Sequence, residues 1–305
     1  MPLYTKDAGY GRTLVNKLGL VTNGMGGGKN FVVGKSALAY SSMYRQLFNP
    51  DADGTVRYFA TITAALGACT AAGNDTIYVL PGHTEDIIGA AGITASVSGV
   101  SIVGLGTGRL RPTLTWKTST AAQIVVSGAN TTWQNFVFDL TGISAVIAAF
   151  SVTAADVSFL DNEFIISTGT NAPVLGILTA ATAARLKVLR NKFIGPATST
   201  DTCTACIQHE VGEDYEINDN YFTGKLTQAV LNATTLLRGQ ISRNFFVIAT
   251  GTKAIAMAAA STPFISNNRI NVPSGTAPIV AAAGFVAGNV YSAAAGVTAG
   301  TASTI

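Results

Sequence analysis

The stretch "VSFLDNEFI", residues 157–165, decides the fold, because its pattern of apolar and polar positions returns five times along the chain. The later copies are "LKVLRNKFI" (186–194), "YEINDNYFT" (215–223), "GQISRNFFV" (239–247), "PFISNNRIN" (263–271) and "FVAGNVYS" (285–292). All six align on an asparagine: Asn162, Asn191, Asn220, Asn244, Asn268 and Asn289. The intervals of 29, 29, 24, 24 and 21 residues between them are typical of a repeat architecture.

Apolar residues hold fixed positions on both sides of the asparagine. Three places before it stand Phe159, Val188, Ile217, Ile241, Ile265 and Val286, and two places after it stand Phe164, Phe193, Phe222, Phe246, Ile270 and Tyr291. This alternation predicts two short strands joined by a sharp bend at the asparagine, once per repeat. The earlier segment 131–140 fits with Trp133 and Phe138 inward and Phe136 in the asparagine position, and residues 99–106 around Ile102 fit more loosely.

A repeat of this length built from strands predicts a β-solenoid, in which each coil buries its apolar face against its neighbours. The variable coil length favours a right-handed parallel β-helix. We expect an irregular N-terminal arm over residues 1–56, the β-helix over 57–292 and a tail over 293–305. Apolar residues at helical spacing within 56–73 predict one short capping helix.

The composition limits the classes of function. The chain is 48% hydrophobic and 11% charged, which is ample material for a core and excludes general disorder. A net charge of +3 without a run of Lys and Arg argues against nucleic acid as a partner. Three cysteines and no apolar leader favour folding in a reducing cytoplasm. Residues 277–297 are long enough to cross a membrane, but Pro278 and Asn289 interrupt them, and we expect packed strands there.

The polar residues beside the asparagines predict two ladders along the solenoid. Equivalent positions in successive coils lie about 4.8 Å apart, so the series Asp161, Arg190, Asp219 and Arg243 places acid next to base at each step. Glu163 followed by Lys192 repeats the pairing. The asparagines are expected to pass hydrogen bonds between coils and to adopt the left-handed backbone of a sharp turn. Both ladders stabilise the scaffold and need no substrate.

Three groups of residues are candidates for sites of chemistry. Glu213, Asp214 and Glu216, with His209 and Glu210 upstream, form the best acidic cluster, but their pattern is typical of a solvated loop and strand face. Cys203, Cys206 and His209 stand at three-residue intervals without a fourth zinc ligand. The segment "GMGGGKN" (24–30) departs from the phosphate-loop pattern at Asn23 and Asn30. We therefore predict no catalytic, metal or cofactor site.

Two segments resemble known proteins. Residues 58–87, "YFATITAALGACTAAGNDTIYVLPGHTEDI", resemble the entry segment of pectin-lyase-like right-handed β-helices, and "VSIVGLGTGRLRPTLTW" (100–116) is similar to the next coil of that family. The resemblance implies the fold. It leaves the function open, because this fold hosts lyases, hydrolases, esterases, phage tailspikes and non-enzymatic virion proteins.

The lead-in of residues 28–66 resembles that of bacteriophage virion proteins of this fold. This resemblance implies a non-enzymatic structural protein that folds in the host cytoplasm and then decorates or cements the capsid. Its partners would be the major capsid protein and its own copies in a homotrimer, with the arm as the anchor. The alternative is a tailspike-like glycan-binding or depolymerising protein that uses Glu213, Asp214 and Glu216. A bacterial surface adhesin is disfavoured by the missing leader.

Overall fold

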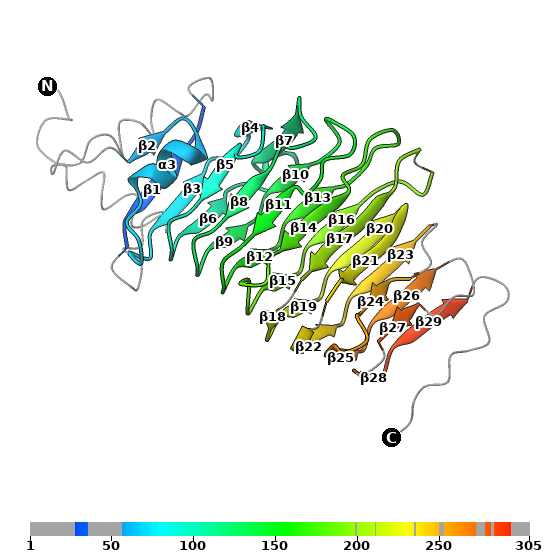
Figure 1. Cartoon of the computed structure of the whole chain (residues 1–305). Helices are drawn as coiled ribbons and strands as arrows, with labels where there is room; N and C mark the ends of the chain where they lie inside the picture. The colour runs from blue at the N-terminus through cyan, green and yellow to red at the C-terminus, as the bar shows by residue number, and fades with distance from the viewer. Residues whose placement is uncertain are drawn as a thin grey trace, which may run out of the picture.

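The chain forms a right-handed parallel β-helix, whose coils stack along one axis, and the part that the structure describes has one α-helix, at the N-terminal end (Figure 1). The computed structural model describes residues 28–35, 57–198, 200–210, 212–234, 236–249, 253–272, 278–281 and 284–293. Every strand pairing among them is parallel, and the strands form three sheets, here named A, B and C. The fold class predicted from the asparagine repeat is therefore confirmed.

Sheet A has twelve strands. They are β1 (Asn30–Val33), β2 (Tyr58–Phe59), β3 (Thr76–Val79), β6 (Ser101–Gly104), β9 (Thr132–Gln134), β12 (Ser158–Leu160), β15 (Lys187–Leu189), β18 (Gly212–Glu213), β19 (Glu216–Asn218), β22 (Leu236–Ser242), β25 (Thr262–Ser266) and β28 (Phe285–Ala287).

Sheet B has nine strands and sheet C has eight. The strands of sheet B are β4 (Thr84–Ile88), β7 (Thr113–Lys117), β10 (Val137–Asp139), β13 (Glu163–Ile165), β16 (Lys192–Ile194), β20 (Tyr221–Gly224), β23 (Phe245–Ile248), β26 (Arg269–Val272) and β29 (Val290–Ala293). Those of sheet C are β5 (Ile93–Ala95), β8 (Ile124–Val126), β11 (Phe150–Val152), β14 (Leu175–Thr179), β17 (Cys203–His209), β21 (Leu226–Asn232), β24 (Ile255–Ala256) and β27 (Ile279–Val280). One coil runs through A, B and C in that order before the chain returns to A.

The interior is filled by side chains that stack on themselves from coil to coil. The rings of Phe164, Phe193, Phe222 and Phe246 lie in one column, with successive centroids 4.4, 4.8 and 4.9 Å apart. All four are fully buried. These are four of the residues expected two places after the asparagine, and their column fixes the register of sheet B.

The N-terminal end of the core is covered by helix α3 (Ile62–Ala68). The Thr61 side chain accepts a hydrogen bond from the Ala64 amide and begins the helix, while Ile62, Ala65 and Leu66 are buried against the first coils. The helix is shorter than the predicted span of 56–73. Phe59, which falls within the predicted span, lies in strand β2, and Cys69 ends the helix.

The predicted arm of residues 1–56 contains a strand of the solenoid. Strand β1 pairs with β3 along its whole length, from Asn30 opposite Thr76 to Val33 opposite Val79, and it also pairs with β2. Phe31 and Val33 are fully buried in the core. The remainder of the arm, 1–27 and 36–56, lies outside the described residues, as does the tail after residue 293.

In the predicted small-residue region 277–297, the described residues form strands β27, β28 and β29. Among the described residues, no helix is long and apolar enough to cross a membrane.

Candidate functional site

The bend between sheets A and B is made by the residue before each asparagine, not by the asparagine. Asp161, Arg190, Asp219 and Arg243 have φ values of 58°, 57°, 60° and 55°. The following asparagines are absent from the set of residues with positive φ. The expectation that the asparagines adopt the left-handed backbone is therefore wrong, because the turn precedes them by one residue.

The asparagines form the predicted hydrogen-bonded ladder inside this bend. The Asn191 Oδ1 accepts from both the main-chain N–H and the side-chain amide of Asn162, at 2.9 and 3.1 Å. The Asn191 side-chain amide donates to the Phe159 carbonyl at 2.8 Å. The same pattern links the rest of the ladder: Asn191 to Asn220, Asn220 to Asn244, Asn244 to Asn268 and Asn268 to Asn289. At the lower end, Asn162 Oδ1 accepts from the Phe136 amide at 2.9 Å.

The ion ladder predicted at the same bend is present as two pairs. Arg190 contacts Asp161 at 2.7 Å, and Arg243 contacts Asp219 at 2.7 Å. Glu163 lies in register with Lys192, but no ion pair joins them among the described residues. Glu163 instead contacts Arg111 at 3.3 Å, and Arg111 also donates to the Asp161 carbonyl at 2.6 Å. The predicted Glu163–Lys192 pair is therefore wrong, because Arg111 reaches Glu163 from the coils below.

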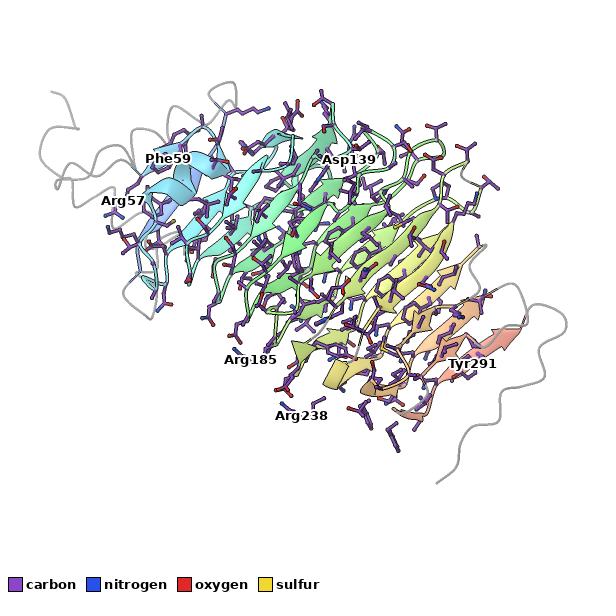
Figure 2. The ribbon with its side chains drawn as sticks, viewed as in Figure 1. Arg57, Phe59, Asp139, Arg185, Arg238 and Tyr291 are labelled. Carbon is purple, nitrogen blue, oxygen red and sulfur yellow. The ribbon has the colours of Figure 1, made fainter. Side chains whose placement is uncertain are left out.

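A second charged ladder, not predicted, lies at the other end of the same strands of sheet A. Its members are Asp156, Arg185, Asp214 and Arg238, all with positive φ. Arg185 binds both carboxylate oxygens of Asp156 at 2.6 Å, and Arg238 contacts Asp214 at 3.0 Å. Figure 2 shows Arg185 and Arg238 along one edge of the solenoid. The pKa of the Asp156 carboxyl is lowered, chiefly by the hydrogen bond from Arg185.

The two charged ladders repeat the same sign within each coil. The corners of sheet A lie five residues apart, so the coils read Asp156 and Asp161, Arg185 and Arg190, Asp214 and Asp219, then Arg238 and Arg243. The signal that could have found the second ladder is this spacing: "DVSFLD", "RLKVLR", "DYEIND" and "RGQISR". Acidic coils thus alternate with basic coils on both edges of sheet A.

Among the described residues, charged side chains occupy the left-handed positions only where a neighbouring coil has a residue of opposite charge. Outside the paired coils, the corner residues are Asn74, Gly99, Asn130, Asn135, Asn267 and Gly288. Asn and Gly are the residues that tolerate this backbone best. The charges therefore serve the stacking of coils, at a position where the backbone alone favours Asn or Gly.

The predicted acidic cluster belongs to this system of ion pairs. Arg238 contacts both Glu213 and Asp214, and Glu216 contacts Lys187 at 3.4 Å. The pKa of the Asp214 carboxyl is lowered, chiefly by the hydrogen bond from Arg238. A general acid needs the opposite shift, since it must hold a proton near neutral pH.

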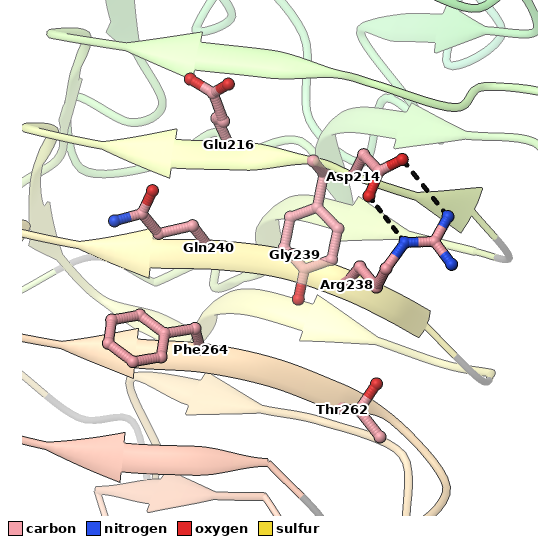
Figure 3. Close-up of a pocket in the computed structure, with 8 residues that line it drawn as sticks. Asp214, Glu216, Arg238, Gly239, Gln240, Thr262 and Phe264 are labelled. Carbon is pink, nitrogen blue, oxygen red and sulfur yellow. Dashed lines mark hydrogen bonds and ion pairs between the residues drawn. The ribbon is translucent and has the colours of Figure 1, made fainter.

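A shallow depression of about 460 Å³ lies on the outer face of sheet A beside these pairs (Figure 3). It is lined by Asp214, Tyr215, Glu216, Arg238, Gly239, Gln240, Thr262 and Phe264. Gly239 leaves room for the buried ring of Tyr215, because a Cβ at this position would lie 1.8 Å from that ring. Phe264 and Phe285 stack at 4.8 Å and are 43% and 42% exposed. The sequence did not reveal this feature.

Cys203, Cys206 and His209 lie on one strand, β17, and are buried. Within the described residues, no group of three His, Cys, Asp or Glu side chains is placed to hold a metal ion. His209 Nδ1 lies 3.1 Å from the Thr179 hydroxyl, and burial lowers the pKa of His209 to about 4. Burial raises the pKa of the Cys206 thiol. These are core residues.

The chain was compared with known proteins by family model, by sequence and by structure. No family model and no curated protein matches it. A solved rhamnogalacturonan lyase is similar to it at 13% sequence identity and a TM-score of 0.39, over 86% of this chain and 87% of that chain. So distant a likeness does not bear on the activity of this chain.

Proposed function

We propose that the chain is a non-enzymatic structural protein of a bacteriophage virion that decorates or cements the capsid, with the major capsid protein and its own copies as partners. The observation that carries this proposal is the use of the acidic side chains. Every described carboxylate has a hydrogen-bond or ion-pair partner within the chain: Asp75, Glu85, Asp86, Asp139, Asp156, Asp161, Glu163, Asp201, Glu210, Glu213, Asp214, Glu216 and Asp219.

The kind of partner matters as much as the number. The carboxylates of the two charged ladders face arginines at bidentate or near-bidentate geometry, which fixes the position of each carboxylate. A glycoside hydrolase instead needs two carboxylates facing one substrate bond. The polar surface thus supports a scaffold, which agrees with the resemblance of residues 28–66 to the lead-in of virion proteins.

The anchoring role proposed for the arm is tested by truncation before strand β1. A chain beginning at residue 28 keeps β1 in sheet A, whereas a chain beginning at residue 57 also removes that strand and exposes β3. We expect the chain from residue 28 to fold like the full chain but to bind isolated capsids at least tenfold more weakly, as measured by co-sedimentation. Unchanged binding would show that residues 1–27 are not the anchor.

A second candidate function, glycan binding or depolymerisation, is favoured by the depression on sheet A. The exposed rings of Phe264 and Phe285 offer flat apolar faces, while Glu216 and Gln240 offer hydrogen-bonding groups beside them. Such a mixture suits a sugar ring, which has apolar faces and polar edges.

The two candidates are separated by replacing Glu213, Asp214 and Glu216 together with alanine, with Glu163→Ala as the control on sheet B. Host-surface polysaccharide is incubated with each folded variant and its chain length is measured. We expect no cleavage by any of these proteins. Cleavage by the wild type that is lost in the triple variant alone would establish the second candidate.

A further inference from the structure

The outer face of sheet C differs from the other two faces because its described strands carry no charged residue. Its outward-pointing residues form one ladder in register across all eight strands: Thr94, Val125, Ser151, Leu178, Gln208, Leu231, Ala256 and Val280. Within the described residues, none of the eight strands of sheet C contains Asp, Glu, Lys or Arg. Figure 1 shows these strands as one continuous row from β5 to β27.

Sheets A and B carry charges on their outer faces along the same coils. The outward ladder of sheet A includes Lys187 followed by Glu216, and that of sheet B includes Glu163 followed by Lys192. Outward charges keep an exposed sheet soluble and discourage its association. Their absence from one face out of three marks that face as the one to be covered, since the centres of interfaces are depleted of charge.

Apolar side chains widen this face, and charges resume at its margins. Ile147, just before β11, is 58% exposed, and a small cluster of Ala148, Leu175 and Ala205 packs with Leu178 and Leu231 outside the main core. The charged residues nearest in sequence lie beyond the strand ends, as at Lys253 before β24 and Glu210 after β17. An apolar centre with a polar rim is the usual anatomy of a protein interface.

The dimensions of this face match those of an interface between two folded proteins. Eight strands about 4.8 Å apart span about 34 Å from the first to the last. At about 3.3 Å per residue, the seven-residue strands β17 and β21 make the face about 23 Å wide at its widest. A stable interface buries about 800 Å² on each partner, which the face approaches where its strands are longest.

The order of side chains along the ladder indicates which partner fits. Large apolar residues, Val125, Leu178 and Leu231, occupy every second coil and therefore stand about 9.6 Å apart. The uncharged Ser151, Gln208 and Ala256 lie between and after them. A surface with the same spacing, shifted by one coil, places its large residues opposite the small Ser151 and Ala256 and the uncharged Gln208, and a second copy of this chain has that surface.

We propose that the outer face of sheet C is a self-association interface, buried against a second copy of this chain. The inference concerns how copies of the chain meet, and it stands whether or not they assemble on a capsid. Its failure is therefore distinguishable from failure of the virion role.

The test places a lysine in the middle of the face. Leu178→Lys and Leu231→Lys are compared with the full-length wild type and with Val137→Lys, which makes the same change on the outer face of sheet B. Sedimentation velocity is measured at micromolar concentrations, and circular dichroism checks that each protein is folded. We expect the wild type and Val137→Lys to sediment as oligomers, and both sheet C variants to shift at least tenfold toward the monomer.

Two results would overturn the proposal. One is a wild type that remains monomeric. If Leu178→Lys also abolished capsid binding in that case, the face would bind a different protein. The other is an oligomer that both lysine variants leave intact.

A second measurement covers the case in which these variants fail to fold. A spin label on Ser151→Cys should report a defined distance between copies, shorter than the distance from the same label on Ser158→Cys of sheet A. The reverse order would place the interface on another face.

Discussion

Asn191 contributes more to the stability of the fold than its exposed neighbour Arg190. Its side chain is 1% exposed and satisfies the Asn162 amide, the Asn162 side chain and the Phe159 carbonyl at once. Buried polar groups that lose their partners destabilise a protein by about 1–3 kcal/mol each. The buried hydrogen bonds of the asparagine ladder therefore stabilise the fold.

Replacement of Asn191 should be far more destructive than replacement at the end of the ladder. We expect Asn191→Ala to lower the free energy of unfolding by about 3 kcal/mol, because buried groups in two coils lose their partners. Asn289→Ala should lower it by about 1 kcal/mol, because the last asparagine is partly exposed and water can replace its bonds. Denaturant unfolding followed by circular dichroism measures both. Equal losses would contradict the ladder as described.

Arg190 combines an unfavourable backbone with a favourable charge. Its φ of 57° suits Asn better than Arg, while its exposed ion pair with Asp161 contributes at most about 1 kcal/mol. We expect Arg190→Asn to change the free energy of unfolding by less than about 0.5 kcal/mol, because the two effects oppose each other. Arg190→Val should be clearly destabilising, since a β-branched residue fits this backbone poorly. A large loss in Arg190→Asn would mean that the pair is stronger than its exposure indicates.

His209 links stability to pH. Burial lowers its pKa from 6.5 to about 4, so the unfolded chain binds a proton between these values and the folded chain does not. The stabilisation is complete above pH 6.5 and is lost as the pH falls toward 4. It amounts to roughly 3 kcal/mol over that range.

The variant His209→Gln should show a flatter dependence of stability on pH between 6.5 and 4. The quantity compared between the variant and the wild type is the slope of the free energy of unfolding against pH. A difference in stability at neutral pH does not affect this comparison. Urea unfolding at intervals across this range gives both slopes. Identical slopes would contradict the buried, uncharged state of His209.

Successive coils differ in the sign of the charged residues at the two left-handed positions that flank sheet A. The single change Arg190→Asp places like charges in the three successive coils of Asp161, residue 190 and Asp219. We expect it to lower the free energy of unfolding by about 1 kcal/mol. Adding Asp161→Arg restores one opposite pair and should recover at least half of that loss. A double variant no more stable than the single one would show that the charges do not act through stacking.

The strands were predictable where a side chain marks them in every coil. The asparagine and its flanking apolar residues predicted the pairing of Phe159 with Val188 and of Phe164 with Phe193, and both pairings are present. Strand β1 was missed because residues 30–33 precede the first recognisable repeat. The second charged ladder was missed because its residues lie outside the aligned segments, five positions before the first ladder.

The surface features depend on properties that no single repeat contains. The depression on sheet A is lined by residues at strands β19, β22 and β25 of three successive coils, which come together only when the coils are stacked. The same holds for the uncharged face of sheet C, whose ladder residues come from strands of differing length and spacing. Sequence periodicity predicts the structure of each coil, whereas a surface feature is formed by residues from several neighbouring coils.

The molecule is a solenoid with polar ladders, and each carboxylate in the described part of the chain has a partner within the chain. Its uncharged face on sheet C is suited to a second copy. These properties agree with a structural role on a larger assembly, where a rigid, regular body is attached by a separate segment. They also explain why the acidic cluster of Glu213, Asp214 and Glu216, which alone might indicate an active site, is accounted for by contacts with Arg238 and Lys187.

Cryo-electron microscopy of whole phage particles that contain this chain tests the proposed role most directly. The account predicts density for the β-helix on the outer surface of the capsid shell, with the copies in contact with one another. Density confined to the tail, with the depression on sheet A turned outward toward the host, would contradict it.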